Sequence, residues 1–193
     1  MFRKIALTLF VLIAVAAVAI FAIASTRPAT YHVERSTLTA ASPSAVYTVL
    51  NDLHRFPEWS PWQKLDPAMK ITHEGPASGV GAKYTWAGNK DVGEGRMTIT
   101  ESTPDQSVVE KLEFLKPWAS TCDVHFTIIP DGDGSKVTWA MDGTNDMMAK
   151  VMSLFMSMDS MIGKDFDAGL ANLKRLTDSA APAAADTTAS KSS

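Results

Sequence analysis

The sequence predicts an α+β fold in which a curved antiparallel sheet of about seven strands wraps around a long C-terminal helix, with one transmembrane helix before the sheet. Three observations lead to this prediction. Short alternating segments fill the middle of the chain and are separated only by turns, which is typical of an antiparallel meander. A helical pattern of apolar residues follows these segments, and an unbroken apolar run precedes them.

The apolar run covers residues 5–24 and contains no charged residue. A helix of this length spans roughly 30 Å, which matches the hydrocarbon core of a bilayer. Arg3 and Lys4 precede the run, so the positive-inside rule predicts a cytoplasmic N-terminus and an extracytoplasmic domain. We therefore expect residues 1–27 to form a single-pass signal anchor that contacts the membrane through the run.

A cleaved secretory signal peptide is the alternative. Ala22, Ile23 and Ala24 form a small-x-small cleavage site, and cleavage after Ala24 would give a secreted or periplasmic protein. The run is longer than the roughly 7 to 15 apolar residues of most secretory signals, which favours the anchor. Both alternatives stay open at the level of sequence.

Composition divides the rest of the chain into a domain, residues 28–178, and a tail, residues 179–193. The domain has a common size for a single hydrophobic core. The tail is rich in Ala, Ser and Thr and has no large apolar residue, so we expect it to be disordered. A net charge of −3 and the lack of a basic cluster argue against a nucleic-acid partner. Cys122 is the only cysteine, which excludes an internal disulfide.

Helical segments flank the predicted strands. Ser42 and Pro43 are typical of the N-cap and first position of a short helix, and prolines interrupt a second short helix or turn within residues 53–62. A less regular helix is expected over residues 146–155, and the long helix begins at Met158. The segments predicted as strands are residues 31–40, 70–74, 83–87, 93–102, 107–115, 121–130 and 136–142.

This order of elements is the helix-grip arrangement. Several stretches of the sequence also resemble a known protein superfamily. The stretches concerned are VERSTLTAASPSAVYTVLNDLHRFPEWSPW, GVGAKYTWAGN, GEGRMTI, VTWAMDG and MDSMIGKDFDAGLANLK. From about residue 31 to residue 177, the chain resembles the SRPBCC superfamily of START-like, Bet v 1-like, polyketide cyclase/dehydrase and lipid transport proteins. The resemblance implies a domain that carries ligands, cyclises substrates or activates a hydrolase, and it implies no universal catalytic residue.

Alternation places the apolar side chains of the predicted strands on one face, opposite the apolar stripe of the last helix. The pattern alone favours a solid core, whereas the resemblance favours an apolar pocket between sheet and helix. We place its entrance near Trp59, Trp62 and the loop at Trp118. The candidate ligand-binding residues are Trp59, Trp62, Tyr84, Trp86, Met97, Phe114, Trp118, Phe126, Trp139, Met158, Met161, Ile162 and Phe166.

Glu110 is the one ionisable residue that alternation places on the apolar face, and Asp165 approaches that face from the last helix. A carboxyl group in an apolar pocket has a raised pKa and could act as an acid or base or orient a polar ligand head. The favoured interpretation is a solvated position near the strand end and the open rim. Glu110 is the only catalytic candidate in the sequence. A comparison of ligand turnover or ligand affinity between Glu110→Gln and the wild type would decide its role.

No motif for a metal or a cofactor is present, and we expect neither. The four histidines are scattered without metal-ligand spacing. Cys122 and His125 lie three apart on one predicted strand, so they point to opposite faces and cannot form a nucleophile–base pair. Residues 131–135 lie between two strands and form a hairpin turn rather than a calcium loop.

The sequence thus predicts a membrane-tethered domain that binds a hydrophobic small molecule or lipid. One alternative is a polyketide cyclase/dehydratase-like enzyme that uses the same pocket, although few ionisable residues face inward to move protons. A second alternative is a protein-interaction domain with a filled core. The identity of the ligand and the oligomeric state stay open.

Overall fold

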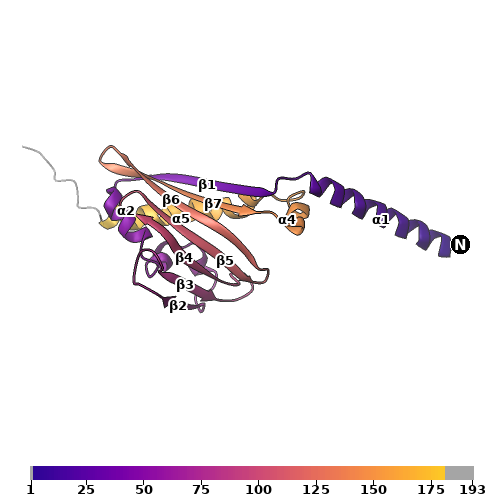
Figure 1. Ribbon diagram of the computed structural model, residues 1–193, viewed down its shortest axis with the longest axis horizontal. Coiled ribbons are helices and arrows are strands. Elements are labelled where there is room, and N and C mark those ends of the chain that lie inside the picture. Colours follow the sequence, from indigo (N-terminus) through magenta and orange to yellow (C-terminus); the bar gives the residue numbers. More distant parts are fainter. Residues whose placement is uncertain (1, 181–193) are drawn as a thin grey trace, which may run out of the picture.

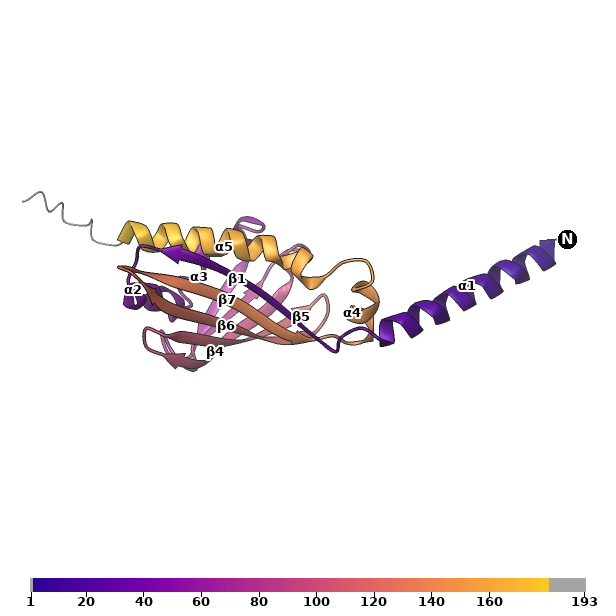
Figure 2. The same ribbon diagram turned by 90° about the horizontal axis from the view of Figure 1, so that it is seen from above.

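The computed structural model describes residues 2–180, and its first helix, α1 (Phe2–Ser25), projects away from the domain (Figures 1 and 2). Within the described residues, α1 is the one helix long and apolar enough to cross a membrane. The predicted disordered tail falls outside the described residues except for Ser179 and Ala180. Those two residues belong to the last helix, which is longer than the sequence pattern indicated.

Seven strands form one antiparallel sheet in the order β1-β7-β6-β5-β4-β3-β2. The first strand pairs with the last. From the second strand to the seventh, each strand pairs with the next one in the sequence, as in a meander. Every predicted strand is confirmed to within about two residues, as expected from strong period-2 alternation. The bounds are β1 (Thr30–Thr39), β2 (Lys70–Glu74), β3 (Lys83–Ala87), β4 (Glu94–Thr103), β5 (Ser107–Lys116), β6 (Ser120–Asp131) and β7 (Gly134–Thr144).

Two short helices connect β1 to β2. Helix α2 (Pro43–Leu50) begins as predicted, because the Ser42 hydroxyl accepts a hydrogen bond from the Ala45 amide. Helix α3 (Phe56–Trp59) carries a proline in its first turn, and the 3-10 turn η1 (Trp62–Lys64) follows. After the sheet, Asp146 caps α4 (Met147–Met152), which ends earlier than expected, and α5 (Met158–Ala180) completes the described chain.

Helix α5 lies along the sheet beside β1 and is attached to that strand near both of its ends (Figure 2). At its N-terminal half, the Arg35 guanidinium contacts Asp159 at 2.7 Å and Asp167 at 3.4 Å. Gly163 leaves room for this guanidinium, because a Cβ at that position would collide with it. Near the other end, the Thr39 hydroxyl donates to Asp178 at 2.6 Å. The two attachments hold α5 at a fixed position over the sheet.

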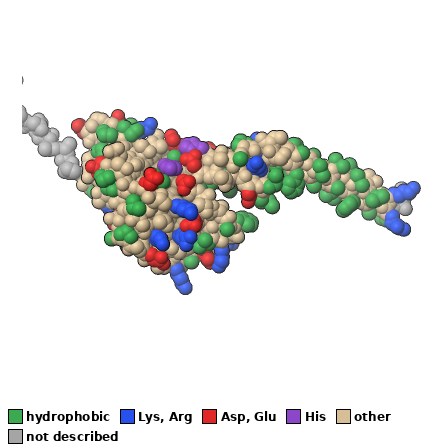
Figure 3. All heavy atoms as spheres, in the orientation of Figure 1, with side chains coloured by type: hydrophobic (Ala, Val, Ile, Leu, Met, Phe, Trp, Pro, Cys, Tyr) green, Lys and Arg blue, Asp and Glu red, His purple; other side chains and the backbone are tan. Residues whose placement is uncertain are grey.

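The core lies between the sheet and α5 and confirms the predicted apolar face. The inward stripe of β6 is buried, whereas the alternate residues of that strand are exposed or half-exposed. Figure 3 shows Lys, Arg, Asp, Glu and His side chains scattered over the domain surface in that view, among hydrophobic and other side chains, and hydrophobic side chains gathered along α1. In β4, a register shift between Ile99 and Glu101 marks an irregularity of the kind that bends a strand.

Candidate ligand-binding cavity

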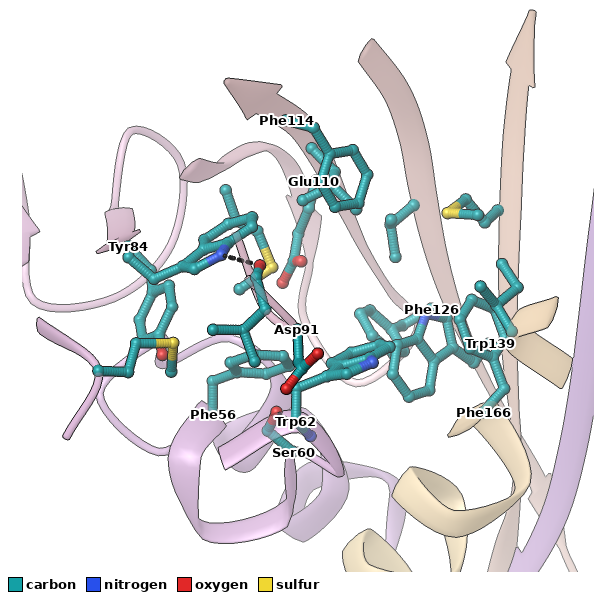
Figure 4. A pocket seen from close by; sticks show the side chains of 18 residues that line it. Phe56, Ser60, Trp62, Tyr84, Asp91, Glu110, Phe114, Phe126, Trp139 and Phe166 are labelled. Carbon is teal, nitrogen blue, oxygen red and sulfur yellow. Dashed lines mark hydrogen bonds between the residues drawn. The ribbon is translucent and has the colours of Figure 1, made fainter. Parts of the chain in front are cut away.

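A cavity of about 210 Å³ lies between the inner face of the sheet and α5. Its walls come from strands β3 to β7, from α3 and η1, from the segments beside them and from α5 (Figure 4). The side chains are mostly aromatic and aliphatic. They are Phe56, Ser60, Trp62, Met69, Tyr84, Trp86, Asp91, Val92, Met97, Glu110, Leu112, Phe114, Val124, Phe126, Trp139, Met141, Ile162 and Phe166.

The volume limits what the cavity can hold in this conformation. It is below the ~300 Å³ at which drug-sized ligand pockets begin. A monocyclic compound or the end of a longer chain fits such a space. Its apolar walls favour an apolar group over water.

Aromatic contacts fix the two sides of the cavity. Phe56 meets Tyr84 edge-on with ring centroids 5.4 Å apart on one side, and Trp139 stacks on Phe166 at 4.1 Å on the other. Gly169 makes the second contact possible, since a Cβ there would lie 2.7 Å from a ring carbon of Trp139. Burial raises the pKa of the Tyr84 phenol to about 12, so this phenol stays neutral.

The mouth of the cavity is marked by lining residues that solvent partly reaches. Asp91 and Val92 belong to the β3–β4 loop, and Trp62 comes from η1 on the opposite side. The Trp62 indole N–H donates to the Asp165 carboxylate at 3.2 Å, which ties this turn to α5. Asp165 thus approaches the apolar face, as expected, and bonds Trp62 rather than entering the cavity.

Glu110 corrects the favoured sequence interpretation. It lies in the middle of β5, the central strand of the sheet, and is only 3% exposed. Its neighbours on the adjacent strands, Ile99 and Val124, are also buried. Burial raises the pKa of the Glu110 carboxyl to about 8. Glu110 is thus enclosed as part of the cavity wall, at a position that we expected to be solvated.

Nine of the thirteen predicted ligand-binding residues line the cavity. Trp59 is buried behind the wall, edge-on to Phe126 and Trp139. Met158 is half-buried against the core, and Met161 is 46% exposed because it lies on the outer side of α5. Trp118 is 81% exposed in the β5–β6 loop and does not line the cavity. The nine are Trp62, Tyr84, Trp86, Met97, Phe114, Phe126, Trp139, Ile162 and Phe166.

Several lining residues were missed. Leu112, Val124 and Met141 lie on strand faces that alternation had already identified as apolar, so the signal for them was present. Phe56, Ser60, Met69, Asp91 and Val92 come from irregular segments or a one-turn helix, where no periodicity indicates direction.

Cys122 and His125 lie on opposite faces of β6, as predicted. The thiol is buried, and desolvation raises its pKa to about 11, whereas the imidazole is on the outer surface. The two side chains form no catalytic pair, and a thiol with a raised pKa is a poor nucleophile.

Residues 30–177 match the family described as polyketide cyclase / dehydrase and lipid transport. The chain belongs to this family. The match covers the whole domain and leaves out α1 and the C-terminal tail. This family lies within the SRPBCC superfamily. The match therefore confirms the resemblance to that superfamily. No curated protein matches the chain.

Solved structures share the fold of this family member at low sequence identity. The ginseng major latex-like protein 151 from Panax ginseng is 14% identical, with a TM-score of 0.56, and the alignment covers 78% of this chain and 99% of that one. The Aha1 dimer from Colwellia psychrerythraea is 15% identical, with a TM-score of 0.56 and coverage of 77% and 96%. The di-domain ARO/CYC StfQ from the steffimycin biosynthetic pathway is 13% identical, with a TM-score of 0.56 and coverage of 78% and 51%. The helix-grip fold is therefore established.

Proposed function

We propose that this protein is a membrane-tethered carrier or sensor of a small apolar molecule taken from the bilayer. The single observation that carries the proposal is the cavity between sheet and α5, which has mostly apolar walls and whose lining includes the partly exposed Trp62 and residues of the β3–β4 loop. Apolar cavities with few polar groups are the usual form of small-molecule sites. Empty volume in a hydrophobic core lowers the stability of the folded protein. The cavity therefore argues against a domain whose core is simply filled.

The position of α1 supports a membrane source for the ligand. Only four residues, 26–29, separate α1 from β1. Asn145 holds this connector, since its amide side chain donates to the carbonyls of Pro28 and Thr30 and its backbone N–H donates to that of Ala29. The end of α1 also contacts α4. A spanning α1 would therefore keep the domain close to the membrane surface, with one end toward it.

The cavity mouth belongs to that same end. The strand register places the β3–β4 loop, the β5–β6 loop and the end of β7 at the same end of the sheet as the start of β1. Large apolar side chains are exposed there, and Phe155 is 77% exposed. Exposed apolar groups of this kind suit contact with lipid. The group comprises Leu115, Trp118, Met147, Met148, Met152, Phe155 and Met156.

Photolabelling tests the proposal in the intact chain. The full protein is placed in lipid nanodiscs with a small apolar diazirine, irradiated, digested and mapped by mass spectrometry. We expect adducts on buried lining residues such as Met97 and Met141. Leu112→Trp should abolish these adducts by filling the cavity, whereas Lys111→Trp, on the opposite face of the same strand, should leave them unchanged.

The outcome separates the competing functions. Adducts confined to α1 and the exposed surface would contradict the proposal and favour a protein-interaction domain. Chemical conversion of an unlabelled apolar compound, with wild-type activity in Lys111→Trp and none in Leu112→Trp, would instead support an enzyme of the cyclase/dehydratase type.

A further inference from the structure

The Glu110 carboxyl group is directed into the cavity and has no hydrogen-bond or ion-pair partner among residues 2–180. Figure 4 shows it between Phe114 and the aromatic side chains of the opposite wall. Burial is the sole cause of its raised pKa, and no hydrogen bond or charge from the described residues 2–180 contributes. Buried polar groups in proteins are nearly always hydrogen-bonded, so an unpartnered carboxyl that faces a cavity indicates a group that the ligand satisfies.

The protonation state decides what this carboxyl can bind. With a pKa of about 8, Glu110 carries its proton at neutral pH and offers one O–H donor and an acceptor oxygen. The other ionisable groups that line the cavity are the neutral Tyr84 phenol and Asp91 at the mouth. The lining contains no Lys, Arg or His.

We infer that Glu110 is a ligand-binding residue whose carboxyl donates a hydrogen bond to the carbonyl, ether or hydroxyl oxygen of an otherwise apolar, uncharged ligand. This inference rests on the proposed function, since it requires a ligand inside the cavity. It narrows the ligand class to uncharged compounds with one hydrogen-bond acceptor near an apolar end.

Charged ligands fit this site less well. An anionic head would lie beside Glu110 and Asp91 with no cation in the lining to balance it. An ammonium head would need Glu110 to ionise, and the desolvation of two charges offsets much of their attraction in an apolar interior. An uncharged acceptor satisfies the carboxyl without either cost.

Competition against the photolabel tests the inference in nanodiscs at pH 7. Four competitors share one hydrocarbon chain and differ in the end group, which is a methyl ester, a hydrogen, a carboxylate or an amine. Each competitor is compared between protein variants, so its own partition into the bilayer cancels. We expect replacement of Glu110 by Leu to weaken competition by the ester about three- to tenfold and to leave the alkane unchanged.

Two further arms keep the test decisive if Glu110→Leu folds poorly. Glu110→Gln retains an N–H donor and should bind the ester nearly as well as the wild type. Raising the pH to 9 should weaken ester binding in the wild type, because Glu110 loses its proton, but not in Glu110→Gln. Lys111→Leu, at the next position but on the outer face, is the matched control.

Equal ester competition in the wild type, in Glu110→Leu and at pH 9 would overturn the inference and leave the cavity as a purely apolar binding site. Stronger competition by the amine than by the ester, lost in Glu110→Gln, would overturn it in favour of a cationic ligand. Absence of cavity labelling in the wild type would overturn both this inference and the proposed function.

Discussion

Trp139 of β7 and Phe166 of α5 stack with ring centroids 4.1 Å apart and ring planes 10° from parallel. Both rings line the cavity, and the contact joins the sheet to the helix that covers it. Trp139 also meets Trp59 and Trp62 edge-on, so one side chain links α5, α3 and η1. The shape of the cavity therefore depends on this pair.

Truncation of Phe166 should be strongly destabilising. Phe166 is 2% exposed, and loss of a buried phenylalanine side chain usually costs about 3–5 kcal/mol. We expect Phe166→Ala to lower the free energy of unfolding by that amount in urea titrations of the full chain in detergent. Met161→Ala, on the exposed side of the same helix, should cost less than about 1 kcal/mol. Equal losses in the two variants would contradict the placement of α5.

Gly169 should tolerate no side chain. A Cβ there would lie 2.7 Å from Trp139 and 3.3 Å from Pro61, so Trp139 must move into the cavity. We expect Gly169→Ala to destabilise the chain by about 1–3 kcal/mol through overpacking, although alanine is the better helix former by ~1 kcal/mol. Ala168→Gly, at the exposed neighbouring position, should change stability through helix propensity alone. A more stable Gly169→Ala variant would show that the helix lies farther from the sheet.

The contact between Trp62 and Asp165 should control how fast a ligand leaves. It ties η1 to α5 beside the mouth, and one hydrogen bond contributes about 0.5–1.5 kcal/mol. We expect Asp165→Ala to accelerate dissociation of a cavity-bound fluorescent ester by about two- to tenfold in stopped-flow experiments. Asp167→Ala, which removes a contact to Arg35 instead, should leave the rate near that of the wild type.

Stability should fall as the pH rises from about 5 to 8. Burial raises the folded-state pKa of Glu110 to about 8 from its ordinary value of 4.5. Between these values the folded chain holds a proton that the unfolded chain has released, so the free energy of unfolding falls by up to about 1.4 kcal/mol per pH unit. Outside this window both states carry the same charge at Glu110, and its contribution to the slope disappears.

Urea titrations from pH 5 to pH 8 measure this slope. The hydrogen bond with Asp142 raises the pKa of His32, which adds a slope of the same sign in part of the range. Glu110→Gln keeps the His32 contribution, so the difference between the two chains isolates Glu110. The variant should have the shallower slope and be the more stable chain at pH 8. Parallel slopes would mean that water or a neighbouring group solvates the carboxyl.

Intact mass spectrometry of protein extracted from membranes should find α1 retained. The run of residues 5–24 is long enough to span the bilayer and longer than most cleaved signals. The expected mass is that of the chain with residues 1–24 present. A mass that corresponds to a chain beginning at Ser25 would remove the anchor and the argument for a membrane source, and it would leave the cavity unaffected.

The sheet could be predicted almost residue by residue because strand alternation is a local property. Burial of the cavity residues is not local. Glu110 and Lys111 are neighbours in one strand, but the first is buried and the second exposed, because burial depends on the elements that pack against each face of the strand. The sequence specified which face Glu110 occupies and could not specify how deeply that face is enclosed.

The rotation of α5 was predicted only in part for a similar reason. The predicted stripe included Gly169, which is buried, and Met161, which is exposed, but it left out Gly163, which is also buried. Gly163 and Gly169 lie where the helix approaches Arg35 and Trp139 most closely, and a glycine has no apolar side chain to signal such a contact in the sequence. Trp118 lies in a loop, where no periodicity indicates whether an aromatic side chain faces a cavity or solvent.

The most direct test of the central claim is anomalous diffraction from crystals of the full chain grown with a bromine-tagged apolar methyl ester. The account predicts a bromine peak inside the cavity between the Trp139–Phe166 stack and the Tyr84 wall, with the ester oxygen toward Glu110. It predicts no such peak in Leu112→Trp. Bromine peaks confined to α1 or the exposed surface, with the cavity of the wild type closed by its own side chains, would contradict the account.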